Sequence, residues 1–452
     1  MREGRLHSSH LKVAMWCSLL LMSAGLAGAQ QLPPGTSSSI TDSERRAAPS
    51  AADMALQRAE DAIAAGRYAD AITVLTPMAT SSQTNERVFY DLGFAQDALG
   101  VDAAAATAYK AAVALNANDV AARLSLGLLL ARGRDLPGAE TQLKAAAGVQ
   151  GAPPELVGKA LRALAQIHLE GQSEQARADM TAALKLSPET PQDTLLVAEI
   201  AVALGDDATA EKAYARAMTA APAPDTALDY ARVLEREGKA TEAKQVLTSA
   251  LKVNSSNPRL RAELASVELK AGRAAEALPL LESAYAADKG NMPVARLLAR
   301  TYVANGTPER GNDLYAALMA AMPDAPELMS EAADSLIRQR QSAEAEKVLQ
   351  RALARPELFK SKASLGKAAE QLAFAASQTG NYEVVLQAVA THEKVLPSDA
   401  AILFLSSVAH DRLHNTRQAV DGYRRFLQVA GGKFPGQELQ ARERLRTLDH
   451  AK

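Results

Sequence analysis

The sequence predicts an all-α protein built as a solenoid of repeated helix-turn-helix units. Hydrophobic residues make up 48% of the 452 residues but aromatic residues only 4%, so the apolar content is mostly Ala and Leu, which are strong helix formers. An amphipathic phrase also recurs, because "AYKAAVALNAND" from Ala108 returns as "AYARAMTAAPAPD" from Ala213. The third observation is the regular spacing of such phrases along the chain.

Each second helix is marked by a small residue near its start, followed four positions later by a large apolar residue. The repeat spacing is the distance in sequence between successive small residues of these pairs. The marker pairs are Ala71/Leu75, Ala105/Tyr109, Ala139/Leu143, Ala176/Met180, Ala210/Tyr214, Ala243/Leu247, Ala277/Leu281, Gly311/Tyr315, Ala345/Leu349, Val385/Val389 and Ala419/Tyr423. Seven of the ten intervals are 34 residues, and the others are 33, 37 and 40. A period of this length with two amphipathic stretches per unit is typical of helix-turn-helix repeats.

In this spacing the chain resembles the tetratricopeptide repeat family over about Ala51 to Val429, in eleven units. The turns between first and second helices carry Gly66, Gly100, Gly171, Gly205, Gly238, Gly272, Gly306 and Gly380. The resemblance implies a right-handed α-solenoid over residues 51–432, closed by a polar capping helix over residues 433–452. The sequence departs from the family pattern in three ways. The repeats lack the family's Trp, the fourth unit is shifted by a few residues near His168, and Val385 replaces the expected small residue in the tenth unit. The wide spacing at residues 354–366 leaves open whether the solenoid continues there.

The first 29 residues have the pattern of an export signal. Basic Arg2, Arg5 and Lys12 precede the apolar run "VAMWCSLLLMSAGL", which is too short to span a bilayer, and "AGA" ending at Ala29 suits a signal peptidase. We expect cleavage after Ala29 and a periplasmic or secreted mature chain, with an uncleaved membrane anchor as the alternative. Residues 30–50, rich in Pro, Ser and Thr, are expected to be a disordered linker.

Charge and motifs point away from several function classes. The formal net charge of −2 lacks the basic excess typical of nucleic-acid binding. The sequence contains no GxxxxGK[ST], GxSxG or HExxH motif, so we expect a non-catalytic protein that needs no cofactor. His410 and His414 stand one helical turn apart, but no further ligands lie near them in sequence, and we expect no metal site.

The resemblance implies that the first helices line a concave face in which a protein or peptide is bound. Its groove positions carry over to Arg87, Tyr90, Phe94, Leu128, Arg232, Arg236, Arg259, Arg296 and Arg300. The pairs Arg232/Arg236 and Arg296/Arg300 each project from one helical face and would suit the carboxylates of a partner. The alternative is a solvated face, on which neighbouring acidic side chains pair with these arginines.

The function expected from these features is an exported protein-protein interaction scaffold that assembles an envelope or secretion complex. An accessory protein of polysaccharide synthesis or export is the alternative class, although the expected groove has few aromatic residues on which sugars could stack. An enzyme is a third class, which the absence of catalytic motifs disfavours.

Overall fold

The computed structural model describes residues 50–81 and 85–449, and these form twenty-three α-helices and one short 3-10 helix, without a strand. The expected signal peptide with its cleavage site after Ala29, residues 30–49 of the expected linker, and residues 450–452 lie outside the described residues. Within the described ranges, no helix is long and apolar enough to cross a membrane. The chain divides into two compact units, and the boundary between them in the sequence lies between Glu237 and Gly238.

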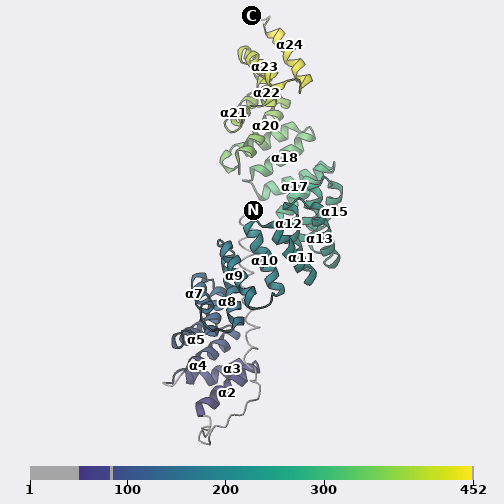
Figure 1. Ribbon diagram of the computed structural model, residues 1–452. Helices are drawn as coiled ribbons and strands as arrows, with labels where there is room; N and C mark the ends of the chain where they lie inside the picture. Colours follow the sequence, from purple (N-terminus) through teal and green to yellow (C-terminus); the bar gives the residue numbers. More distant parts are fainter. Residues whose placement is uncertain (1–49, 82–84, 450–452) are drawn as a thin grey trace. The chain divides into compact units, whose positions relative to one another are not determined.

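The N-terminal unit consists of helices stacked in chain order (Figure 1). They are α2 (Ala51–Ala64), α3 (Tyr68–Ala79), α4 (Glu86–Ala98), α5 (Asp102–Leu115), α6 (Val120–Arg132), α7 (Leu136–Ala147), α8 (Pro154–His168), α9 (Ser173–Leu186), α10 (Pro191–Leu204), α11 (Asp207–Ala220) and α12 (Pro224–Arg236). Each second helix packs against the first helix of the next repeat, and α2, α4, α6 and α8 also contact one another in sequence. These first helices therefore form the inner layer of this stretch.

The C-terminal unit is built in the same way. Its elements are α13 (Ala240–Val253), α14 (Pro258–Lys270), α15 (Ala274–Ala287), α16 (Met292–Ala304), α17 (Pro308–Ala321), α18 (Pro326–Arg338), α19 (Ser342–Leu353), the 3-10 helix η1 (Pro356–Leu358), α20 (Lys362–Thr379), α21 (Tyr382–Glu393), α22 (Ala400–Arg412), α23 (Thr416–Ala430) and α24 (Pro435–Asp449). Helix α24 packs on α23 as the expected capping helix. The predicted all-α solenoid of helix-turn-helix repeats is confirmed.

The repeat markers explain how the helices approach one another. All eleven marker pairs are buried, including those of the less regular fourth and tenth repeats. A Cβ atom on Gly93 would lie 2.7 Å from the ring of Tyr109, and one on Gly127 would lie 2.7 Å from Cγ of Leu143. The small residue of the first helix is therefore needed because the large residue of the second helix occupies the space beside it.

The turns between paired helices adopt the left-handed conformation that the glycines predict. Gly272, for example, has a φ of +76°, where an L side chain is strained. The repeats without a turn glycine place Arg134, Arg340 and His414 in the same region, with φ values of 66°, 57° and 60°. These three turns keep their geometry because the surrounding helix pair imposes it.

The solenoid continues through the wide spacing at residues 354–366. The additional residues form η1 and lengthen α20 to 18 residues, while α20 still contacts both α18 and α19. Phe359 packs against the core of these helices, and the backbone N–H of Lys360 donates to Glu327 Oε1 at 2.7 Å. The spacing of 40 residues is thus an insertion within a continuous stack.

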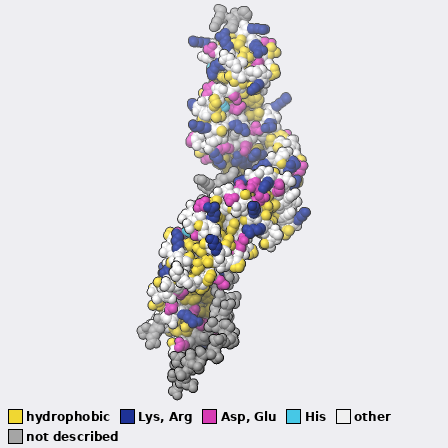
Figure 2. All heavy atoms as spheres, in the orientation of Figure 1, with side chains coloured by type: hydrophobic (Ala, Val, Ile, Leu, Met, Phe, Trp, Pro, Cys, Tyr) yellow, Lys and Arg dark blue, Asp and Glu magenta, His cyan; other side chains and the backbone are white. Residues whose placement is uncertain are grey.

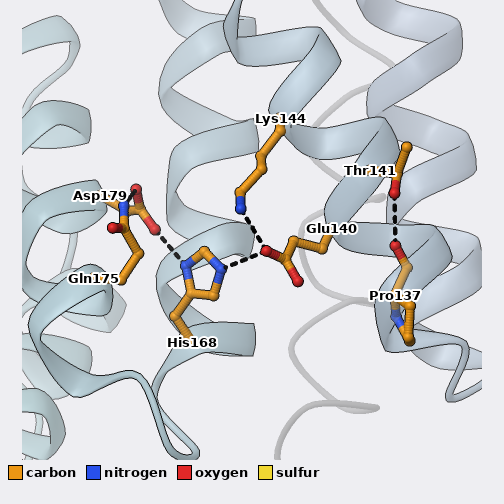
Figure 3. A network of polar contacts seen from close by, with 7 residues as sticks. All are labelled: Pro137, Glu140, Thr141, Lys144, His168, Gln175 and Asp179. Atoms are coloured by element: carbon orange, nitrogen blue, oxygen red, sulfur yellow. Dashed lines mark hydrogen bonds and ion pairs between the residues drawn. The ribbon is translucent and has the colours of Figure 1, made fainter.

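The fourth repeat is held by a buried polar network around His168 (Figure 3). Its Nδ1 lies 2.6 Å from Asp179 Oδ2 on α9, and its Nε2 lies 3.2 Å from Glu140 Oε1 on α7. Lys144 donates to the same Glu140 oxygen at 2.5 Å, and these two neighbours, Lys144 first, lower the pKa of Glu140. The imidazole therefore connects three consecutive helices where the repeat spacing is irregular.

A second buried charge lies in the C-terminal unit. Glu268 on α14 is 2% exposed, and it accepts hydrogen bonds from Lys244 Nζ at 2.7 Å and from Arg273 Nε. Burial by itself would raise the pKa of Glu268, but the two cations outweigh it and the pKa is lowered. This carboxylate joins α13, α14 and the turn before α15.

Candidate protein-binding groove

An open groove with a volume of about 580 Å³ lies in the N-terminal unit, at the ends of its second, third and fourth repeats. It is lined by Glu86, Arg87, Tyr90, Asn116, Asn118, Asp119, Val120, Ala121, Val149, Gln150, Gly151, Ala152, Pro153 and Leu156. These residues come from the first two turns of α4, from the first turns of α6 and α8, and from the two loops that precede α6 and α8. Two of the predicted groove residues, Arg87 and Tyr90, are among them.

Helix capping fixes the walls of this groove. Asn85 caps α4 by accepting from the backbone of Val88 at 3.2 Å, and Asp119 caps α6 by accepting from Ala122 at 3.0 Å. In the loop before α6, Asn116 Oδ1 accepts from the N–H of Asn118 at 3.1 Å. Polar side chains at the groove thus order the backbone of the helix starts.

A large part of the groove lining comes from the irregularity in the repeat. The interval of 37 residues between Ala139 and Ala176 places a loop, residues 148–153, between α7 and α8. Five of its residues line the groove, and Gly151 makes the sharp turn with a φ of +73°. Sequence reasoning missed this loop, although the wide interval together with Gly151 and Pro153 was a signal that could have located it.

Tyr90 on α4 lines the groove and belongs to a cluster of aromatic side chains. Tyr90 packs on Phe94 with ring centroids 6.5 Å apart and on Tyr109 at 5.9 Å, while Phe94 contacts Tyr68 at 6.3 Å. Burial raises the pKa of Tyr90, which keeps the phenol neutral. Tyr90 therefore presents an apolar, partly buried edge to the groove, whereas Phe94 lies on the same helix beyond it.

Two carboxyl groups and one guanidinium meet next to the groove. Arg87 Nη2 lies 2.5 Å from Glu60 Oε1 on α2, and Asp91 follows one turn later on α4. Burial, then repulsion by Glu60, raise the pKa of Asp91 to about 7, although Arg87 opposes the shift. The Oδ2 atom of Asp91 is buried without a hydrogen-bond partner among the described residues. Glu60 and Asp91 thus share one cation.

One predicted groove residue is placed differently by the structure. Leu128 is 2% exposed and packs in the core that joins α6, α7 and α8. Because α8 contacts α6 directly, it covers the face of α6 that carries Leu128. Leu128 is therefore a core residue whose side chain is not accessible to a partner, so its assignment to the groove was wrong.

Besides Arg87, which pairs with Glu60, three more of the predicted basic groove residues pair with acidic side chains of the chain itself. Arg232 Nη1 lies 3.1 Å from Asp229 Oδ1, and Arg236 Nη2 lies 2.5 Å from Asp207 Oδ1. Arg296 donates to both oxygens of Glu331 at 2.9 Å, and this pairing raises its pKa despite partial burial. These contacts fit the alternative interpretation of the sequence, in which neighbouring acidic side chains pair with the arginines.

The remaining basic positions, Arg259 on α14 and Arg300 on α16, have exposed side chains. They belong to the C-terminal unit with Arg296, whereas Arg232 and Arg236 belong to the N-terminal unit. On the face seen in Figure 2, basic and acidic side chains are interspersed over both units. This face therefore shows no broad basic surface.

His410 and His414, the pair with the spacing of metal ligands, occupy different environments in the structure. His410 is partly buried, and this burial lowers its pKa, whereas His414 occupies a left-handed turn. Across residues 50–81 and 85–449 no group of three or more His, Cys, Asp or Glu side chains is arranged to hold a metal ion.

The buried marker pairs, the left-handed turns and the stacked helix pairs define a helix-turn-helix repeat solenoid. Family models described as tetratricopeptide repeat match residues 90–155, 162–224, 268–311 and 296–359. The chain belongs to the tetratricopeptide repeat family. None of the curated proteins compared with the chain matches it.

Solved structures of repeat proteins are similar to this chain at low identity. A tetratricopeptide repeat protein from Parabacteroides merdae is 14% identical, covering 57% of this chain and 98% of that chain, with a TM-score of 0.41. Yeast Tom70 is 13% identical, with coverages of 88% and 96% and a TM-score of 0.36. Pseudomonas aeruginosa PilF is 17% identical, with coverages of 48% and 96% and a TM-score of 0.40.

Proposed function

We propose that this protein is an exported, non-catalytic scaffold that binds an extended segment of a partner protein in the groove at the starts of α4, α6 and α8. The observation that carries the proposal is the groove itself, which combines apolar surface from Tyr90, Val149 and Leu156 with polar side chains and loop backbone. Binding sites of this size are usually largely apolar, with a few polar groups that fix orientation.

The repeat architecture supports a binding role. A solenoid presents a long surface relative to its core, and each repeat contributes side chains from its first helix to one wall. In this chain the inner contacts among α2, α4, α6 and α8 place these helices side by side, next to the groove. A partner segment lying there would touch three repeats at once.

Export is the second part of the proposal, and it rests on the sequence of residues 1–29. The apolar run and the small residues ending at Ala29 are typical of a cleaved signal. The mature chain would contain no Cys, because Cys17 is the only one, and would suit an oxidising compartment. Assembly of an envelope or secretion complex is the role that fits such a scaffold.

Site-specific photo-crosslinking in cells tests the groove. A benzoylphenylalanine residue in place of exposed Gln150, which lines the groove, should give a discrete adduct with a partner protein. The same residue in place of exposed Lys110 on α5, outside the groove lining, is the matched control. An adduct at position 110 with none at position 150 would place binding elsewhere on the solenoid.

A further inference from the structure

The charges around the groove indicate the chemistry of its occupant, an inference that rests on the proposed function. Glu86 and Asp119 line the groove, and Arg87 is the only basic residue in its lining. Arg87 is also engaged, since its guanidinium pairs with Glu60 at 2.5 Å. The lining therefore carries an excess of negative charge.

Asp91 adds to this excess, although it is not part of the groove lining. It lies one turn further along α4, and its Oδ2 is buried without a hydrogen-bond partner among the described residues. Because Glu60 and Asp91 share the single cation Arg87, one carboxyl group of the pair stays uncompensated when both are ionised. Charges in a partly buried setting act more strongly on their neighbours than charges in water.

The apolar part of the groove favours an apolar side chain beside the Lys or Arg of a bound segment. Val149, Ala152, Pro153 and Leu156 come from the loop before α8 and from α8 itself, and they line the same groove as the charged start of α4. An aliphatic side chain would contact these residues, while the stem of a Lys or Arg would lie along them with its charged end toward α4.

We propose that the groove selects an extended partner segment in which a Lys or Arg side chain stands next to an apolar side chain. This differs from the sequence-based expectation of an acidic partner, which relied on four arginines, three of which the structure pairs internally. Complementary charge gives specificity and faster association, so its effect should depend on salt.

Labelled nonapeptides of the pattern Gly-Ser-Leu-X-Val-X-Leu-Ser-Gly, with X as Lys, Gln or Glu, test the proposal by fluorescence anisotropy on the full-length chain. The Lys peptide should bind about tenfold more tightly than the Glu peptide at low salt, with the Gln peptide between them. Added salt should reduce this difference. Equal affinity of the three peptides would overturn the selection for a cation but leave groove binding intact.

Variants assign the effect to particular carboxylates. Glu86→Gln and Asp91→Asn should each reduce the preference for the Lys peptide about threefold or more. Glu383→Gln, an exposed change on α21 in the C-terminal unit, should leave the preference unchanged. Circular dichroism checks that each variant is folded. An unchanged preference in both folded groove variants would contradict the proposal.

The pH dependence of binding provides a readout specific to Asp91. The charged groups that act on Asp91 are Glu60 of α2, which raises its pKa to about 7 together with burial, and Arg87 of its own helix, which lowers it. Asp91 therefore takes up a proton as the pH falls from about 8 to about 6, and its negative charge is lost. Affinity for the Lys peptide should fall over this range in the natural chain and much less in Asp91→Asn.

Two further outcomes are decisive. The same fall in affinity in both proteins would show that Asp91 does not act on the occupant. Failure of all three peptides to bind would overturn the proposed selection, whereas the crosslink at position 150 decides separately whether the groove binds a protein.

Discussion

The close approach of α6 and α7 can be tested by adding a single methyl group. Gly127 lies inside α6, and a Cβ atom there would be 2.7 Å from Cγ and 2.8 Å from Cδ2 of Leu143. Leu143 is fully buried and cannot rotate into solvent. The change Gly127→Ala therefore forces two helices apart or moves Leu143 from its preferred rotamer.

The expected magnitude combines two opposing effects. Replacing a glycine in a helix by alanine stabilises the helix by about 0.5–1 kcal/mol, whereas overpacking a dense core costs about 1–3 kcal/mol. We expect a net loss of about 1 kcal/mol for Gly127→Ala. Leu143→Ala by itself should cost about 2–5 kcal/mol, and clearly less when the added methyl group of Gly127→Ala occupies part of the cavity.

Urea denaturation followed by circular dichroism measures these changes, and hydrogen exchange of the α6 and α7 segments locates them. The matched control is Gly436→Ala in α24, where the added Cβ would have no atom within 4 Å. The control should be neutral or slightly stabilising. If Gly127→Ala stabilised the protein as much as the control, or if the two changes at Gly127 and Leu143 were additive, the proposed close packing would be refuted.

Three other predictions concern turns, buried charge and export. In thermal melts, Arg340→Gly should stabilise the protein by about 0.5–1 kcal/mol and Gly272→Ala should destabilise it by about 1 kcal/mol, because both turns have positive φ; the opposite signs would contradict this. Glu268→Gln should cost about 1–3 kcal/mol at pH 7. The lowered pKa of Glu268 means that this stabilisation is present above the usual value of 4.5 and is lost as pH falls below it, so urea titrations of both proteins should converge in acid. If the proposed export is right, N-terminal sequencing of the protein isolated from cells should begin at Gln30, and a chain still starting at Met1 would exclude cleavage.

Much of the fold could be predicted because the structure of each repeat depends on residues that are close together in the sequence. Ala105 and Tyr109 stand on one helical face, and Gly100 precedes them at a left-handed turn, so a short stretch specifies its own helix, turn and buried face. The same pattern predicted the register of the irregular tenth repeat, where Val385 and Val389 are buried as expected.

The candidate site was predictable only in part. Arg87 and Tyr90 line the groove because their positions follow from the helical period of α4. The assignment of Leu128 failed because its burial depends on how α8 crosses α6, and α8 begins after a loop that departs from the repeat. That loop supplies much of the groove, and its conformation has no periodic signal in the sequence.

By itself, the sequence determined the helices, their turns and the small residues at which they cross, because these depend on neighbours within one period of the chain. Only the tertiary structure decided which charges remain available to a partner. Arg296 and Glu331 stand 35 positions apart and Arg87 and Glu60 stand 27 apart, yet each pair meets across adjacent first helices. Electrostatic pairing acts through space, so the acidic excess at the groove could be recognised only after the helices were stacked.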